Sequence, residues 1–110
     1  MVAGLADGTG GAGFYKNLAE SKTPREFLDR VAQIPRNKTI PDQWESQVLA
    51  RILGKHHVIM VSDIVSPEIV RNMHMELATS FDEALKCARQ LRGADAKIAV
   101  IPNGLSVIVS

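Results

Sequence analysis

The residues best suited to chemistry form a glycine-rich run, Gly-Thr-Gly-Gly-Ala-Gly, at residues 8–13. The run matches G-x-G-x-x-G, in which glycines let the backbone approach a pyrophosphate at the start of a helix. An apolar segment precedes it and a helix is expected after it, as such a site requires. A dinucleotide site also needs a second strand with an acidic ribose ligand about 20 residues further on, and a helix is predicted there instead. We therefore favour a structural turn and keep a dinucleotide-binding domain as an alternative.

The histidines and the cysteine do not form the patterns expected of a metal site or a catalytic nucleophile. His56 and His57 are adjacent at the start of a predicted strand, where neighbouring side chains point to opposite sides. No cysteine or carboxylate completes a tetrahedral set with them, or with His74, at a familiar spacing. Cys87 is the single cysteine, and no sequence neighbour would lower its pKa. We predict that this chain holds no catalytic, metal-binding or cofactor-binding residue.

Three residues remain as candidates for contact with a substrate. Trp44 is the single tryptophan, and it stands beside Gln43 in the first turn of a predicted helix. Most such tryptophans are core anchors, whereas one that lines a cleft would stay partly exposed. Asp63 follows a predicted strand, and open α/β sheets bind ligands at the carboxyl ends of their strands. Asp42 and Glu45 fit a capping box and need no catalytic role.

Local capping signals position the helices that carry these residues. Residues 23–26, Thr-Pro-Arg-Glu, combine an N-cap threonine, a proline at the first helical position and a glutamate three residues after the cap. Residues 42–45, Asp-Gln-Trp-Glu, repeat this logic for a helix that ends near Leu53. Residues 66–68 and 80–83 start two further helices, and Gly93 ends the last one.

Short apolar runs predict the strands. We expect residues 2–5, 58–61 and 98–101 to lie in one sheet. Residues 105–109 form a fourth strand if the Asn-Gly dipeptide makes a hairpin turn, whereas Pro102 just before it favours another path for the tail. Strands that alternate with helices predict an α/β fold: a small layered domain with a mainly parallel three- to four-stranded sheet, helices packed on it, and an incomplete Rossmann-like arrangement. The predicted core contains Phe14, Leu18, Phe27, Val31, Leu49, Ile52, Ile59, Val61, Phe81, Leu85, Ala88 and Val100.

Composition narrows the class of protein. The chain has 110 residues, 45% of them apolar, and a formal net charge of +1, so we expect residues 1–110 to form one soluble α/β domain. Because 13 basic and 12 acidic residues are scattered along the chain, we expect neither nucleic acid nor an anionic membrane as a partner. The central apolar run, residues 58–61, is far shorter than the roughly 20 residues of a membrane span, and residues 1–13 lack the basic region of a signal peptide. A lone cysteine fits a reducing compartment, and we expect the cytoplasm.

Several of these segments, in this order, look like one known family. They are residues 5–10 with Phe14-Tyr15, and residues 23–26, 42–53, 58–63 and 100–104. The Asp-Gln-Trp-Glu helix start and the closing Ile-Pro-Asn-Gly are the most specific pieces. Over nearly its whole length the chain resembles the C-terminal part of the nickel-dependent lactate racemase family.

The resemblance implies a two-domain α/β enzyme that interconverts the enantiomers or epimers of 2-hydroxy acids. Its cofactor is a nickel pincer nucleotide tethered to a lysine, with histidines as acid–base partners. These groups belong to the N-terminal domain and have no counterpart in this chain. Trp44 resembles the residue that lines the cleft beside cofactor and substrate, so for Trp44 we favour the cleft over the core.

We therefore expect this chain to be the C-terminal domain of a 2-hydroxy acid racemase or epimerase, and to be inactive alone. It would contribute one wall of an interdomain cleft, with the N-terminal catalytic domain and a small 2-hydroxy acid as partners. A homo-oligomer would form through an exposed sheet edge or domain face. The alternatives are a stand-alone α/β interaction or ligand-binding module without catalysis, and the dinucleotide-binding domain.

Overall fold

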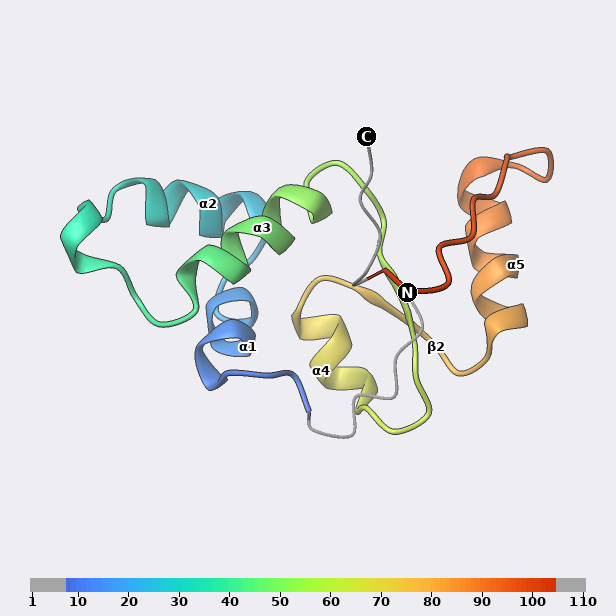
Figure 1. Ribbon diagram of the computed structural model, residues 1–110, viewed down its shortest axis with the longest axis horizontal. Helices are drawn as coiled ribbons and strands as arrows, with labels where there is room; N and C mark the ends of the chain where they lie inside the picture. Colours follow the sequence, from blue (N-terminus) through green and yellow to red (C-terminus); the bar gives the residue numbers. More distant parts are fainter. Residues whose placement is uncertain (1–7, 105–110) are drawn as a thin grey trace.

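The computed structural model describes residues 8–104, which form a small set of helices around a two-stranded sheet (Figure 1). The strands predicted at residues 2–5 and 105–109 lie outside the described residues. The elements follow the order α1 (Ala12–Ala19), α2 (Pro24–Ala32), a short 3-10 helix η1 (Arg36–Lys38), α3 (Gln43–Leu53), β1 (Ile59–Val61), α4 (Pro67–Asn72), β2 (Glu76–Ala78) and α5 (Phe81–Arg92).

The sheet is parallel, and α4 makes the connection between its two strands. Ile59 lies opposite Glu76, and Val61 opposite Ala78. This arrangement confirms an α/β fold with helices packed on a parallel sheet, and β1 lies where a strand was predicted. The partner β2 was not predicted, because three residues are too few to show a strand pattern.

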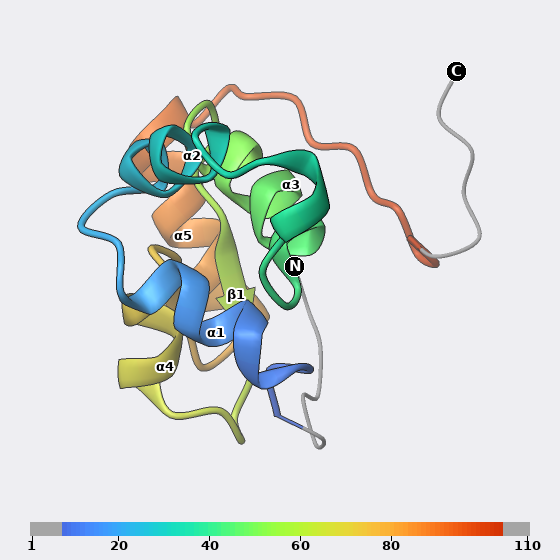
Figure 2. The same cartoon turned by 90° about the vertical axis from the view of Figure 1, so that its left-hand side faces the viewer.

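The strand predicted at residues 98–101 is wrong. These residues are exposed and carry no strand assignment, and the Val100 side chain is 79% exposed. Figure 2 shows residues 97–104 running away from the helices. An apolar run becomes a strand only where a neighbouring strand completes its backbone hydrogen bonds, and nothing in residues 8–104 pairs with this one.

The main core lies on one side of the sheet. Helices α1, α2 and α3 pack on one another, α1 contacts α4, and α5 lies alone on the other side of β1 (Figures 1 and 2). The central cluster consists of Leu18, Phe27, Val31, Ala50, Met60, Val70, Met73 and Met75.

This arrangement decides which predicted core residues are buried. Leu18, Phe27, Val31 and Val61 are buried, and Phe14, Leu49, Ile59, Leu85 and Ala88 are half-buried. The prediction is wrong for Ile52, Phe81 and Val100, which are exposed. Helix α5 has no buried residue because, of the described elements, it packs mainly on two three-residue strands.

Two predicted helix caps form as expected. The Thr23 hydroxyl oxygen accepts the backbone N–H of Glu26 at 3.1 Å, and the Ser80 hydroxyl oxygen accepts the N–H of Glu83 at 3.1 Å. The Glu83 carboxylate in turn accepts the N–H and the hydroxyl of Thr79 at 2.9 and 2.8 Å. These hydrogen bonds lower the pKa of Glu83 below its ordinary value, because they favour the charged carboxylate.

Candidate functional site

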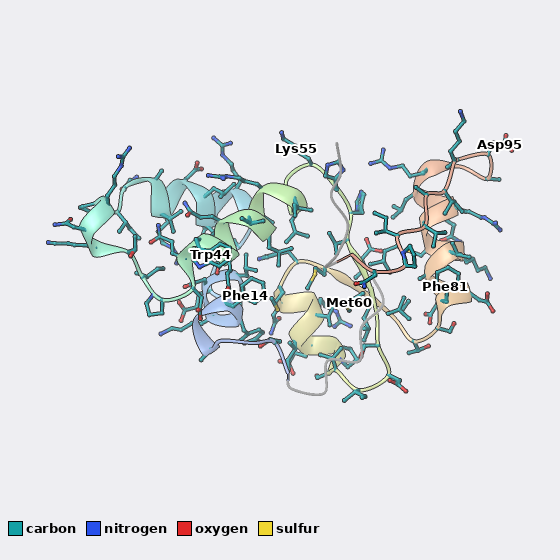
Figure 3. The ribbon with its side chains drawn as sticks, in the orientation of Figure 1. Phe14, Trp44, Lys55, Met60, Phe81 and Asp95 are labelled. Atoms are coloured by element: carbon teal, nitrogen blue, oxygen red, sulfur yellow. The ribbon has the colours of Figure 1, made fainter. Side chains whose placement is uncertain are left out.

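An apolar groove of about 490 Å³ lies between α3, β1 and α4. Phe14 of α1, Trp44 of α3 and Met60 of β1 line it together, and Figure 3 labels all three. The other lining residues are Thr9, Glu45, Val48, Leu49, Ile52, Val58, Val65, Ile69, Val70, Met73 and Met75. Concave apolar surfaces with few polar groups are where proteins most often bind small molecules.

Helix α3 presents two different faces. Ser46 and Ala50, one turn apart, are fully buried toward the other helices. Trp44, Val48 and Ile52 follow the same spacing on another face, and they are 70%, 48% and 42% exposed. The small buried residues let α3 approach its neighbours closely, and the large apolar residues are left to line the groove. Trp44 is therefore not a core anchor in the described structure.

The glycine-rich run has a structural explanation. The Asp42 side chain lies over it, and Asp42 Oδ2 accepts the backbone N–H of Phe14 at 3.2 Å. A Cβ atom on Gly11 would collide with the Asp42 carboxylate, and one on Gly13 would lie 2.8 Å from the backbone oxygen of Pro41. The glycines thus permit a close approach between the start of α1 and the loop before α3.

This approach also argues against a dinucleotide site. The Asp42 carboxylate stands at the N-terminus of α1, where a phosphate would bind in a nucleotide-binding domain. A phosphate placed there would meet a negative charge at close range. The capping box predicted for Asp42 and Glu45 is wrong for the same reason: the Asp42 side chain makes no cap hydrogen bond to α3, because it is turned toward α1.

A buried polar network fixes the first turn of α3 on α1, and sequence reasoning missed it. Asn17 is buried in α1, and its Nδ2 donates to the Pro41 carbonyl and to Ser46 Oγ, both at 3.0 Å. The Ser46 hydroxyl donates to the Asp42 carbonyl at 2.8 Å. The one available signal was the polar Asn17 directly before the apolar Leu18 within a predicted helix.

The two weaker binding candidates lie outside the groove lining. Gln43 is half-buried, and its Oε1 accepts the backbone N–H of Ile40 at 3.1 Å, so the amide braces the turn before α3. Asp63 is exposed just after β1. Of the three predicted binding residues, the structure brings only Trp44 to the groove.

His57 and Cys87 meet one carboxylate away from the groove. Glu76 on β2 lies 3.6 Å from His57 Nδ1, and its Oε2 accepts the Cys87 thiol at 3.1 Å. The hydrogen bond to the Glu76 carboxylate raises the pKa of Cys87, which disfavours the reactive thiolate. Within residues 8–104, no three His, Cys, Asp or Glu side chains are arranged to hold a metal ion. The described residues therefore do not fit a nickel site of their own.

No helix in the described part of the chain is both long enough and apolar enough to cross a membrane.

Comparison with known proteins gives a consistent match over nearly the whole chain. The model of the lactate racemase C-terminal domain matches residues 1–109. Lactate racemase from Lactiplantibacillus plantarum is 59% identical over 109 residues, which make up 99% of this chain and 26% of that protein. Lactate racemase from Thermoanaerobacterium thermosaccharolyticum is 49% identical over the same shares of the two chains. The structure of the lactate racemase apoprotein from that organism superposes with a TM-score of 0.94, covering 99% of this chain and 26% of the other. The chain thus spans about a quarter of the length of these relatives.

Proposed function

Since the chain belongs to the lactate racemase C-terminal domain family, we propose that it forms one wall of an interdomain cleft in which a racemase or epimerase binds a 2-hydroxy acid. The opposite wall belongs to an N-terminal catalytic domain, and residues 1–110 form one α/β domain beside it. The observation that carries the proposal is the exposure of Trp44, which is 70% exposed and lines an apolar groove. Helix α3 packs on the other helices through a different face, that of Ser46 and Ala50. A large aromatic ring exposed at a groove is well suited to cover a bound ligand.

In this proposal Trp44 contributes binding and shielding from water. Apolar covering strengthens the electrostatic interactions that other groups make with a charged substrate. Gln43 and Asp63 are weaker candidates for contact with the substrate. Gln43 braces the turn before Trp44, and Asp63 lies just after β1. By the resemblance of this chain to the lactate racemase family, the nickel pincer nucleotide and the acid–base histidines would belong to the N-terminal domain.

The isolated chain is expected to show no turnover. A racemisation needs its reacting groups held on one scaffold, and that advantage is lost when one wall of the cleft is separated from the other. We expect the cytoplasm as the location of this domain, in keeping with its single free cysteine.

The test compares Trp44→Ala with Trp44→Phe in the full-length protein that carries this domain. Conversion of L-lactate to D-lactate is followed by chiral chromatography. Loss of indole contact corresponds to about 1.5–3 kcal/mol, so Trp44→Ala should lower kcat/KM by roughly ten- to a hundredfold, and Trp44→Phe by less.

Phe81→Ala is the matched control. Phe81 is also an exposed aromatic residue, but it lies on α5 and outside the groove lining. Its removal should leave kcat/KM unchanged. Unchanged racemisation in Trp44→Ala would refute the proposal, as would a loss in Phe81→Ala equal to that in Trp44→Ala.

A further inference from the structure

We propose that Asp42 is a positioning residue for the groove: its carboxylate joins α1 to the first turn of α3 and so sets Phe14 and Trp44 relative to each other. The kinetic consequence rests on the proposed function of Trp44. The geometric part concerns only contacts within the chain.

One side chain connects the backbones that carry both aromatic rings. Asp42 Oδ2 accepts the N–H of Phe14 at 3.2 Å, and Phe14 is itself a lining residue of the groove. Trp44 follows Asp42 by two residues and is the second residue of α3. A shift of Asp42 therefore moves the start of both helices, and with them both aromatic walls.

The backbone at Asp42 is held in an uncommon conformation. Its φ is 55°, in the left-handed region that is adopted mainly by glycine, asparagine and aspartate. The Ser46 N–H and hydroxyl donate to the Asp42 carbonyl at 3.1 and 2.8 Å, and Asn17 holds the neighbouring Pro41 carbonyl. Hydrogen bonds from two neighbouring elements thus hold this conformation in place.

The chain also reserves space for this carboxylate. Gly11 and Gly13 are the residues whose added Cβ atoms would meet Asp42 or Pro41. The carboxylate lies at the positive end of the α1 dipole, which favours its charge. The space left by the glycines, the helix dipole and the hydrogen bond from Phe14 thus all favour the contact between the Asp42 carboxylate and α1.

Two substitutions separate the carboxylate from the backbone conformation. Asp42→Gly removes the carboxylate but adopts a positive φ freely, so the turn keeps its shape. Only the hydrogen bond from the Phe14 N–H to the carboxylate is lost, and the bonds from Asn17 to Pro41 and Ser46 remain. Asp42→Asn keeps an oxygen that can accept the Phe14 N–H and also tolerates the left-handed region. Asp95→Gly, at an exposed position in the turn after α5, is the control for replacing an aspartate with glycine.

Fluorescence of the 110-residue chain reads the geometric part directly, because Trp44 is its single tryptophan. The emission maximum and acrylamide quenching of Asp42→Gly should differ from those of the parent chain under conditions where both are folded by circular dichroism. Asp42→Asn and Asp95→Gly should match the parent. A purely structural role would lower the midpoint of urea unfolding but leave the spectrum of the folded protein unchanged, and that result would overturn the inference.

Kinetics of the full-length protein read the functional part. Displacement of a binding wall should raise KM for lactate about tenfold in Asp42→Gly, with a smaller effect on kcat, and Asp42→Asn should restore KM. Unchanged KM in Asp42→Gly, with a clear loss in Trp44→Ala, would overturn the positioning role alone. Unchanged kinetics in Trp44→Ala would overturn the proposed function, while the fluorescence result would still decide whether Asp42 sets the position of Trp44.

Discussion

Replacing each of two phenylalanines with alanine tests the assignment of the core. Sequence periodicity places Phe27 and Phe81 in the core alike, but the structure separates them. Phe27 in α2 is fully buried in the central cluster, and Phe81 at the start of α5 is 57% exposed. The two variants delete the same atoms from different surroundings, so their difference in stability measures burial.

The expected magnitudes follow from that difference. A buried phenylalanine loses its transfer free energy and leaves a cavity, so Phe27→Ala should lower the free energy of unfolding by about 3–5 kcal/mol. A little under half of Phe81 is covered, and solvent fills the space that its ring leaves. Its loss should therefore cost about half of a 1.5–3 kcal/mol transfer term, or about 1 kcal/mol.

Urea titration followed by far-UV circular dichroism gives both values, provided that the slope m stays constant. Should Phe27→Ala be unfolded without urea, Phe27→Leu supplies a milder variant with an expected loss of about 1–2 kcal/mol. Equal losses for the two alanine variants would refute the core described above, and so would a larger loss at Phe81.

Two further predictions concern close contacts. Gly13→Ala should destabilise the chain by about 1–3 kcal/mol, because its Cβ would lie 2.8 Å from a backbone oxygen. Gly54→Ala should be neutral or slightly stabilising, because its Cβ would lie 3.5 Å from the nearest atom. Thermal unfolding of both variants measures the difference, and a lower stability for Gly54→Ala than for Gly13→Ala would contradict the tight packing of the glycine run. Glu76→Gln should speed the reaction of Cys87 with Ellman's reagent near neutral pH, because loss of the carboxylate lets the raised pKa of Cys87 fall and increases the thiolate fraction. A slower or unchanged reaction would show that Glu76 does not control this thiol.

The sequence predicted helix caps correctly where the capping residue and its partner are close together in the chain. The Thr23 and Ser80 caps bond to residues three positions away, so their spacing identifies them. Asp42 carries the same sequence signal, yet its carboxylate binds Phe14, 28 residues distant. Only the tertiary fold decides between those two partners.

Periodicity has a similar limit on α3. Trp44, Val48 and Ile52 form an apolar stripe that fits either a core or a groove, because period alone does not say what faces it. The fully buried side chains of α3 are instead Ser46 and Ala50, whose small size permits close packing between helices. Strand β2 was missed because residues 76–78 begin with a glutamate and are too few to show alternation.

The two faces of α3 have a consequence for how such a domain can evolve. Substitutions at Trp44, Val48 or Ile52 change the chemistry of the groove, while the contacts that hold the helix in place run through Ser46, Ala50 and Asn17. Within α3, substitutions on the exposed groove face should therefore affect stability less than substitutions on the buried face. A helix divided in this way can change the side chains of its groove face by single substitutions while the contacts that hold it on the other helices are kept.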